Sequence, residues 1–119
     1  MAIDGGQTRY TDVAGTPELR KAAAAWLNAA HQLDFAPEHI VVSVGAKHSL
    51  FNLFFALLCA DDEVIVPAPY WVSYPEMVTF AGGKPVIVET TLARGLKAPA
   101  VDLEAKITPR TRAIVLCSP

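Results

Sequence analysis

The chain has 119 residues, a formal net charge of −2 and 52% hydrophobic residues. This length suits one modest domain, and the composition is that of a folded core rather than of a disordered segment. No cluster of lysine and arginine is interleaved with aromatic residues, which argues against a nucleic-acid partner. The longest apolar stretch, Leu53 to Ala60, is too short to span a bilayer, and the start of the chain lacks a secretory-signal pattern. The sequence therefore predicts a cytoplasmic protein.

The cysteines and histidines give no support for a disulfide framework or a metal site. Cys59 and Cys117 both lie in apolar runs, where a thiol behaves as a small hydrophobic group. The three histidines, His31, His39 and His48, lack the spacing of metal ligands.

The first half of the chain predicts one helix and one strand. Thr16 is a favourable N-cap and Pro17 suits the first helical position. Apolar residues then recur at helical spacing, so the helix is expected to end near His31. The segment 40–44 is β-branched at four of its five positions, which predicts a strand buried on both faces.

The second half alternates between helix and strand. Residues 46–59 are apolar almost all round, which predicts a helix buried between layers, followed by a turn at Asp61-Asp62. We then expect, in chain order, a strand at 63–66, a helix at 73–80 closed by Gly82-Gly83, a strand at 86–88, a short helix capped by Asp102 and continuing to Ile107, and a strand at 113–116.

Strands that alternate with helices are typical of parallel βαβ units. The sequence therefore predicts an α/β fold, with a partial, mostly parallel open sheet and helices on both faces. Ligands bind beyond the carboxyl ends of the strands in such sheets. Three segments that follow predicted strands are expected to meet at this edge: Gly45-Ala46-Lys47, Pro69-Tyr70-Trp71 and Ser118-Pro119.

Gly45-Ala46-Lys47 is a candidate phosphate-binding turn, because a predicted strand stops there and a helix begins. The N–H groups in the first turn of a helix lack intrahelical partners and lie at the positive end of the helix dipole, which suits an anion. Glycine at a strand–helix connection also serves the turn alone. This pattern by itself leaves both interpretations open.

Several motifs cover nearly the whole chain: Thr8-Arg9-Tyr10-Thr11, Gly15-Thr16-Pro17-Glu18-Leu19-Arg20, Val44-Gly45-Ala46-Lys47, Pro69-Tyr70-Trp71-Val72-Ser73-Tyr74-Pro75, Thr108-Pro109-Arg110-Thr111-Arg112 and Ser118-Pro119. Their order and spacing resemble the class I pyridoxal-phosphate-dependent aminotransferases, and most closely the bacterial aspartate aminotransferases. The resemblance implies that residues 1–119 are part of the coenzyme-binding large domain of such an enzyme, truncated at both ends.

The resemblance also implies a cofactor, pyridoxal 5'-phosphate, and residues that bind it. Gly45, Ala46 and Lys47 would hold the phosphate, and Trp71 would stack on the coenzyme ring. Tyr10 would cross a homodimer interface to the phosphate held by the partner subunit. Trp71 would also line the substrate pocket, and Lys47 would lie near the distal carboxylate of a dicarboxylic substrate. From position alone, a core tryptophan, a buried tyrosine and an exposed lysine are the alternatives.

The implied reaction transfers an amino group between an amino acid, L-aspartate in the first place, and 2-oxoglutarate. The alternatives are an aromatic or prephenate-type aminotransferase or a related lyase, a ligand-sensing domain of a transcriptional regulator, and an inactive truncated product. No catalytic residue is assigned within the chain, because the family's Schiff-base lysine lies downstream of Ser118-Pro119. The 119 residues alone are therefore expected to be inactive.

Overall fold

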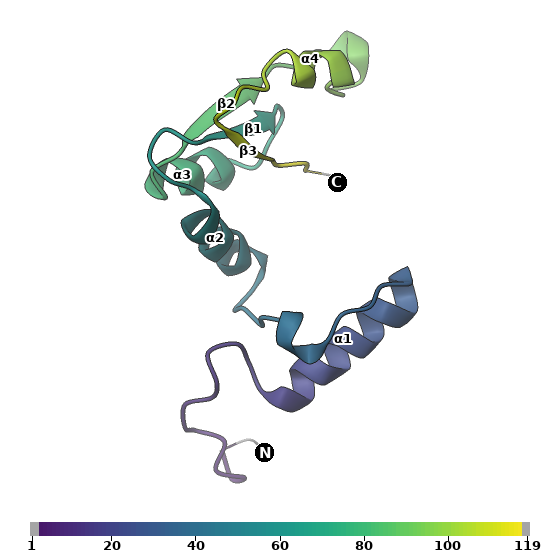
Figure 1. The fold of residues 1–119 in the computed structure, drawn as a ribbon, viewed down its shortest axis with the longest axis vertical. Coiled ribbons are helices and arrows are strands. Elements are labelled where there is room, and N and C mark those ends of the chain that lie inside the picture. The colour runs from purple at the N-terminus through teal and green to yellow at the C-terminus, as the bar shows by residue number, and fades with distance from the viewer. Residues whose placement is uncertain (1–2, 118–119) are drawn as a thin grey trace. The chain divides into compact units, whose positions relative to one another are not determined.

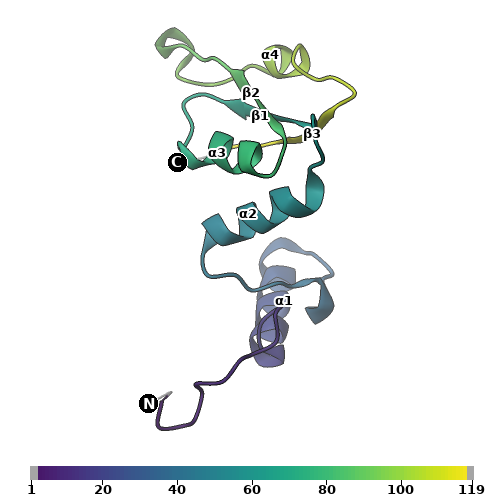
Figure 2. The same ribbon diagram turned by 90° about the vertical axis from the view of Figure 1, so that its left-hand side faces the viewer.

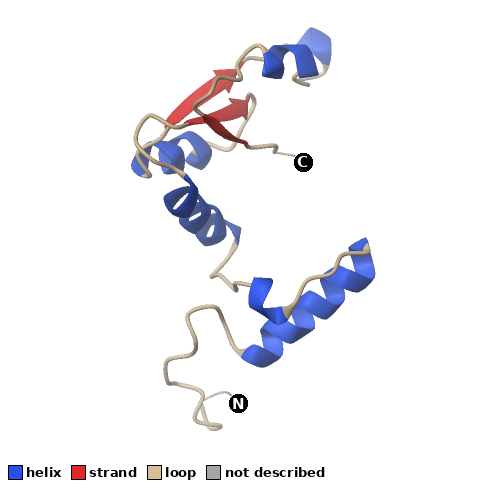
Figure 3. Cartoon of the chain, in the orientation of Figure 1, coloured by secondary structure: helices blue, strands red, loops and turns tan. Residues whose placement is uncertain are grey.

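The computed structural model describes residues 3–117 (Figure 1). The chain divides into two units, residues 1–49 and 50–119. The described part of the first unit contains one long helix and no strand, and the second unit contains a small sheet with its helices (Figure 3). Within the described residues, every helix is too short or too polar to cross a bilayer.

The first unit is built around α1, Pro17–His31, which begins and ends where the sequence predicts. The Leu19 N–H donates to the Thr16 side chain at 3.5 Å, so the predicted N-cap is confirmed. A short 3-10 helix, η1, spans Pro37–His39. The Nε–H of Arg20 donates to the carbonyls of Pro37 and Ile40 at 3.1 and 3.0 Å, which fastens this segment to α1.

The strand predicted at 40–44 is not formed in the structure. Val41 and Val44 are 65% and 89% exposed, and no described strand pairs with this segment. The Val42 N–H instead donates to the Ala14 carbonyl at 2.9 Å. β-Branched residues favour an extended backbone, but a strand also needs a hydrogen-bonded neighbour, and the described residues supply none.

The second unit has a three-stranded parallel sheet in the order β2-β1-β3, which confirms the predicted α/β class. The register places Glu63 opposite both Lys84 and Thr111. All three strands therefore begin at one edge, here called the amino edge, and end at the other, the carboxyl edge. β2 and β3 both begin two residues earlier than predicted, and β3 also ends two residues earlier. The strands span Glu63–Pro67 for β1, Lys84–Val88 for β2 and Thr111–Ile114 for β3.

Two helices pack on one side of this sheet, and α4, Ala100–Glu104, lies on the other side in both views (Figures 1 and 2). α3 spans Ser73–Phe80, as predicted. α2, Ala46–Leu57, begins in the first unit, continues into the second and ends two residues before the predicted end. Its expected burial on all sides is wrong, because Leu53 and Phe55 are 53% and 49% exposed. One face of α2 contacts the core, and the described residues provide no second layer over the other.

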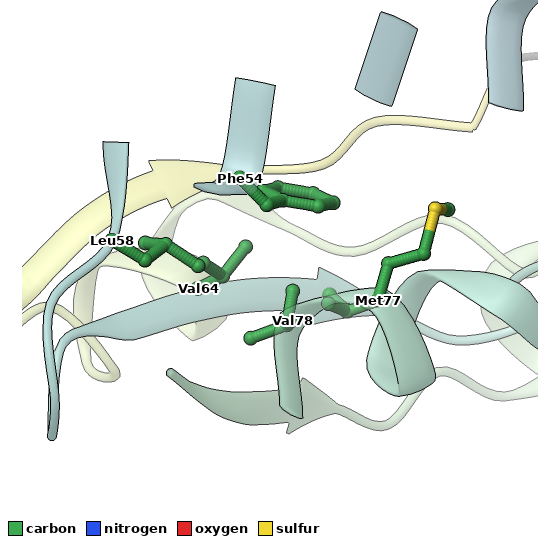
Figure 4. Close-up of a cluster of buried hydrophobic side chains, with 6 residues drawn as sticks. Phe54, Leu58, Val64, Met77 and Val78 are labelled. Carbon is green, nitrogen blue, oxygen red and sulfur yellow. The ribbon is translucent and has the colours of Figure 1, made fainter. Parts of the chain in front are cut away.

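The core lies between these helices and the central strand (Figure 4). Val64 and Val66 share one face of β1, as residues two apart in a strand must. The buried cluster is completed by Phe54 in the last turn of α2, Leu58 just beyond that helix, and Met77 and Val78 from α3. Truncating a fully buried phenylalanine such as Phe54 typically costs about 3–5 kcal/mol.

Asp102 does not cap α4, contrary to the prediction. The N-cap of α4 is Pro99, and Asp102 lies inside the first turn. Its carboxylate accepts a hydrogen bond from the Arg94 guanidinium at 2.7 Å, at the end of the 3-10 helix η2, Leu92–Arg94. The aspartate therefore links two short helices instead of starting one.

Candidate functional site

A cavity of about 670 Å³ lies beyond the carboxyl ends of β1 and β3. Its lining residues come from the loop after β1, the segment after η2, helix α4 and the chain after β3: Pro67, Ala68, Pro69, Tyr70, Gly95, Leu96, Lys97, Ala98, Leu103, Leu116 and Cys117. The segments that follow two different strands thus meet at the carboxyl edge. The predicted contribution of Ser118-Pro119 lies outside the described residues. Gly45-Ala46-Lys47 belongs to the first unit, and its place at this edge stays a prediction.

The loop after β1 carries Trp71 and is hydrogen-bonded at both ends. At its start, the Ala68 N–H donates to the Val88 carbonyl at 2.9 Å, and the Thr90 hydroxyl donates to the Ala68 carbonyl at 2.6 Å. The peptide bond between Ala68 and Pro69 is cis. At its end, the Tyr74 N–H donates to the Trp71 carbonyl at 3.0 Å, in the first turn of α3. Both ends of the loop are therefore fixed to regular structure.

Trp71 is 38% exposed, so it is not a core tryptophan in this structure. Its ring packs edge-on against Tyr74, with centroids 5.5 Å apart and planes at 87°. The Tyr74 hydroxyl in turn donates to Cys117 Sγ at 3.8 Å. This hydrogen bond, helped by partial burial, raises the pKa of Tyr74 above its ordinary value. Aromatic packing thus orients an indole that keeps part of its surface exposed.

The candidate phosphate turn has the expected backbone geometry. Gly45 has φ +93°, and a Cβ there would meet nothing within 4 Å, so the backbone conformation rather than space requires glycine. α2 begins at the next residue, Ala46. The N–H groups of Ala46 and Lys47 therefore lie in the first turn of the helix, at the positive end of its dipole. The ring nitrogen Nδ1 of His48 accepts the Val44 N–H at 3.3 Å, which ties the helix back to the turn.

The segment that leads into this turn is held by the motif before and within α1. A Cβ on Gly15 would lie 2.8 Å from the Val42 side chain, and Gly15 has φ +99°, so only glycine permits this approach. The approach allows the hydrogen bond from Val42 to Ala14, and Arg20 holds the preceding residues. The Gly15–Arg20 motif therefore positions the chain just before Gly45.

Tyr10 and Lys47 are both exposed. A buried position for Tyr10 is therefore excluded in this structure. Its predicted role needs a partner subunit, and the predicted role of Lys47 needs a substrate, so both roles stay predictions.

The amino edge of the sheet holds polar residues that sequence reasoning did not single out. Glu63 is buried, and it accepts hydrogen bonds from the Thr108 hydroxyl at 2.6 Å and from Arg110 at 3.2 Å. Asp62, also buried, accepts from the Cys59 N–H and from Arg112, both at 2.9 Å. The bond from Thr108 is the main cause that lowers the pKa of Glu63, and the Cys59 N–H does the same for the pKa of Asp62. These carboxylates are fully paired and serve the fold.

Thr90 was also missed. The available signal was a hydroxyl residue soon after an apolar strand, which is too common to identify a role, and its partner Ala68 lies 22 residues earlier.

Comparisons with known proteins agree with this geometry. The family model described as aminotransferase class I and II matches residues 1–119. A protein of Thermus aquaticus named probable aspartate/prephenate aminotransferase is 51% identical over 118 residues, which are 99% of this chain and 31% of that protein. One of Rhizobium leguminosarum bv. phaseoli with the same name is 49% identical, over 99% of this chain and 30% of its own length.

Solved structures give the same result. The aspartate aminotransferase from Thermus thermophilus with maleate superposes with a TM-score of 0.91 at 50% identity, covering 97% of this chain and 30% of that one. The aromatic aminotransferase from Pyrococcus horikoshii gives 0.86 at 35% identity, covering 95% and 30%. The chain thus spans about 30% of the length of these relatives. From motif, fold and sequence identity together, the chain belongs to the class I and II aminotransferases.

Proposed function

We propose that residues 1–119 are part of the coenzyme-binding domain of an aminotransferase that transfers an amino group between L-aspartate and 2-oxoglutarate. The match of the whole chain to the family carries the proposal. Because the chain spans about 30% of its relatives, the activity is proposed for a longer protein, and no catalytic residue is assigned here. A cytoplasmic location likewise stays a prediction.

Pyridoxal 5'-phosphate would supply the electron sink that stabilises negative charge on the substrate's α-carbon. The residues present fit this group. The N–H groups of Ala46 and Lys47 would bind the phosphate at the positive end of α2, and Gly45 permits the turn. The partly exposed indole of Trp71 would stack on the ring and orient it. Tyr10 would reach the phosphate bound to the partner subunit of a homodimer through its hydroxyl.

Lys47 would favour an acidic substrate, because its ammonium would lie near the distal carboxylate, and Trp71 would line the same pocket. In the full-length protein, Lys47→Ala should reduce the preference for acidic over neutral amino acids, whereas Lys21→Ala, in the second turn of α1, should not. An unchanged preference in the Lys47 variant would contradict this role.

A prephenate-type activity is the second candidate, because the relatives from Thermus aquaticus and Rhizobium carry both aspartate and prephenate in their names. Amino-transfer assays with aspartate and either 2-oxoglutarate or prephenate as acceptor would separate the two.

The deciding experiment titrates pyridoxal 5'-phosphate into the full reading frame and into residues 1–119, with absorbance spectra and borohydride trapping. We expect a borohydride-reducible Schiff-base band in the long form only. Absence of the band in the long form would contradict the proposed function. A band in residues 1–119 would contradict the assignment of the Schiff-base lysine to a downstream segment.

A further inference from the structure

The last residue of β2 and the chain just after it hold the start of the Trp71 loop through both backbone polar groups of Ala68. The Ala68 N–H donates to the Val88 carbonyl at 2.9 Å, and the Ala68 carbonyl accepts from the Thr90 hydroxyl at 2.6 Å. The first bond extends the pairing of β1 with β2 by one step beyond Pro67 and Val88. The second is made by a side chain, so it depends on the identity of residue 90.

The far end of the same loop is held differently. Trp71 and Tyr74 are joined by a backbone hydrogen bond and by edge-on ring packing, and Tyr74 contacts Cys117 beyond β3. The loop is therefore fixed by the end of β2 and the residues just after it at one end, and by α3 at the other. Rotation of the peptide group that contains the Ala68 carbonyl would move the residues just before Trp71 while α3 stays in place.

The hydroxyl of Thr90 donates to the Ala68 carbonyl and so opposes this rotation. Thr90 is half-buried, and its bond to Ala68 is partly buried, so water replaces it less easily than at an exposed site. A valine at this position keeps the shape but leaves the Ala68 carbonyl without its donor, which costs more than removing both partners would.

We infer that Thr90 is a positioning residue: through the Ala68 carbonyl it sets the Trp71 loop, and so the indole, for stacking on the coenzyme ring. The stacking rests on the proposed function, whereas the ordering of the loop does not. Thr90 contacts neither coenzyme nor substrate in this scheme and acts through the backbone alone.

The test compares three variants of the full-length protein. Thr90→Val removes the hydroxyl and keeps the shape, and Thr90→Ser keeps the hydroxyl. Thr91→Val is the matched control, because Thr91 is exposed and its side chain makes no capping bond to η2. Hydrogen exchange of a peptide that covers residues 68–74 measures the loop without coenzyme. Titration with pyridoxal 5'-phosphate, with circular dichroism in the coenzyme band, measures the consequence.

We expect Thr90→Val to exchange faster in residues 68–74, to bind the coenzyme about fivefold to tenfold more weakly and to change the circular dichroism band. Thr90→Ser and Thr91→Val should resemble the wild type in all three measurements. If Thr90→Val fails to fold, Thr90→Ala serves in its place, because it also lacks the hydroxyl and adds no bulk.

Unchanged exchange in the variant without the hydroxyl would overturn the inference. Equal losses in Thr90→Val and Thr90→Ser would also overturn it, because a side chain that keeps the hydroxyl would then fail to order the loop. Faster exchange with unchanged coenzyme binding would remove the link to Trp71. A wild type that binds no coenzyme contradicts the proposed function instead, and the exchange data still decide whether Thr90 orders the loop.

Discussion

The two edges of the sheet in residues 50–119 are built from different chemistry. At the amino edge, the carboxylates of Asp62 and Glu63 are buried and paired with Arg112 and Arg110. At the carboxyl edge, backbone hydrogen bonds and mostly neutral side chains surround a cavity of about 670 Å³. Charges that are paired within the chain are committed to stability, whereas the other edge leaves room for a ligand. Polar side chains near strand ends therefore do not by themselves identify a ligand site.

Trp71→Ala should give the largest effect that is confined to the carboxyl edge. In the full-length protein we expect coenzyme affinity to fall about tenfold or more, because the stacked ring is lost. The midpoint of thermal unfolding should change little, since Trp71 is partly exposed. Trp26→Ala is the control, because Trp26 is an exposed indole on α1. Equal coenzyme affinity in the two variants would contradict the stacking role.

Two glycines with the same backbone conformation should fail in different ways. Gly45 and Gly82 have φ +93° and +91°, and a Cβ would meet open space at both. Each alanine variant therefore incurs only the left-handed backbone cost, about 1–2 kcal/mol. Gly45→Ala should weaken coenzyme binding roughly fivefold, a factor near 1 kcal/mol. Gly82→Ala, in the turn before β2, should lower the free energy of unfolding without this loss. Calorimetry and coenzyme titration distinguish the two variants. Weaker coenzyme binding in Gly82→Ala but not in Gly45→Ala would contradict the role of the Gly45 turn.

Glu63→Gln should weaken the amino edge in a pH-dependent way. The folded pKa of Glu63 lies below its ordinary value, so its contribution is present above the unfolded pKa of about 4.3 and is lost as pH falls through the lower, folded value. Thermal midpoints between neutral and acid pH should therefore fall for the wild type and fall less steeply for the variant. Glu76→Gln, exposed on α3, is the control. If the thermal midpoint of Glu63→Gln fell with pH as steeply as that of the wild type, the pairing of Glu63 would not contribute to stability.

Lys84→Ala should have the smallest effect. Lys84 forms an ion pair with Asp61, but the two side chains are 61% and 65% exposed. Exposed pairs contribute little and are screened by salt. We expect a change in the thermal midpoint smaller than that of Glu63→Gln, and no change in high salt. A decrease in the thermal midpoint that does not depend on salt would contradict this expectation, because salt screens an exposed ion pair.

Local sequence signals predicted the elements whose ends are determined by neighbouring residues. Thr16 and Pro17 determine the start of α1 from neighbouring residues alone, and the bounds of α3 were also predicted from the sequence. The strand at 40–44 and the all-round burial of α2 were wrong for a shared reason. Both depend on neighbours that the described chain does not provide, and an apolar pattern cannot show whether such neighbours exist.

The candidate site was predictable to the same extent. The glycine turn at Gly45 and the Pro69–Trp71 loop have local signatures, and the structure places each next to a helix or strand end. The residues that hold the turn and the loop in place have no such local signature. Thr108 lies 45 residues from Glu63, and Thr90 lies 22 residues from Ala68. Such bonds follow from the sheet register, which periodicity does not reveal.

The strand order β2-β1-β3 has a consequence for synthesis on the ribosome. β1 occupies the centre of the sheet, yet both of its neighbours follow it in the chain, and its partner Thr111 emerges long after Glu63. The backbone N–H and C=O groups of Val64–Val66 must therefore leave the exit tunnel before either flanking strand exists to pair with them. A nascent chain stalled between β2 and β3 would present one unpaired edge of β1, and unpaired strand edges make partly folded chains prone to aggregation.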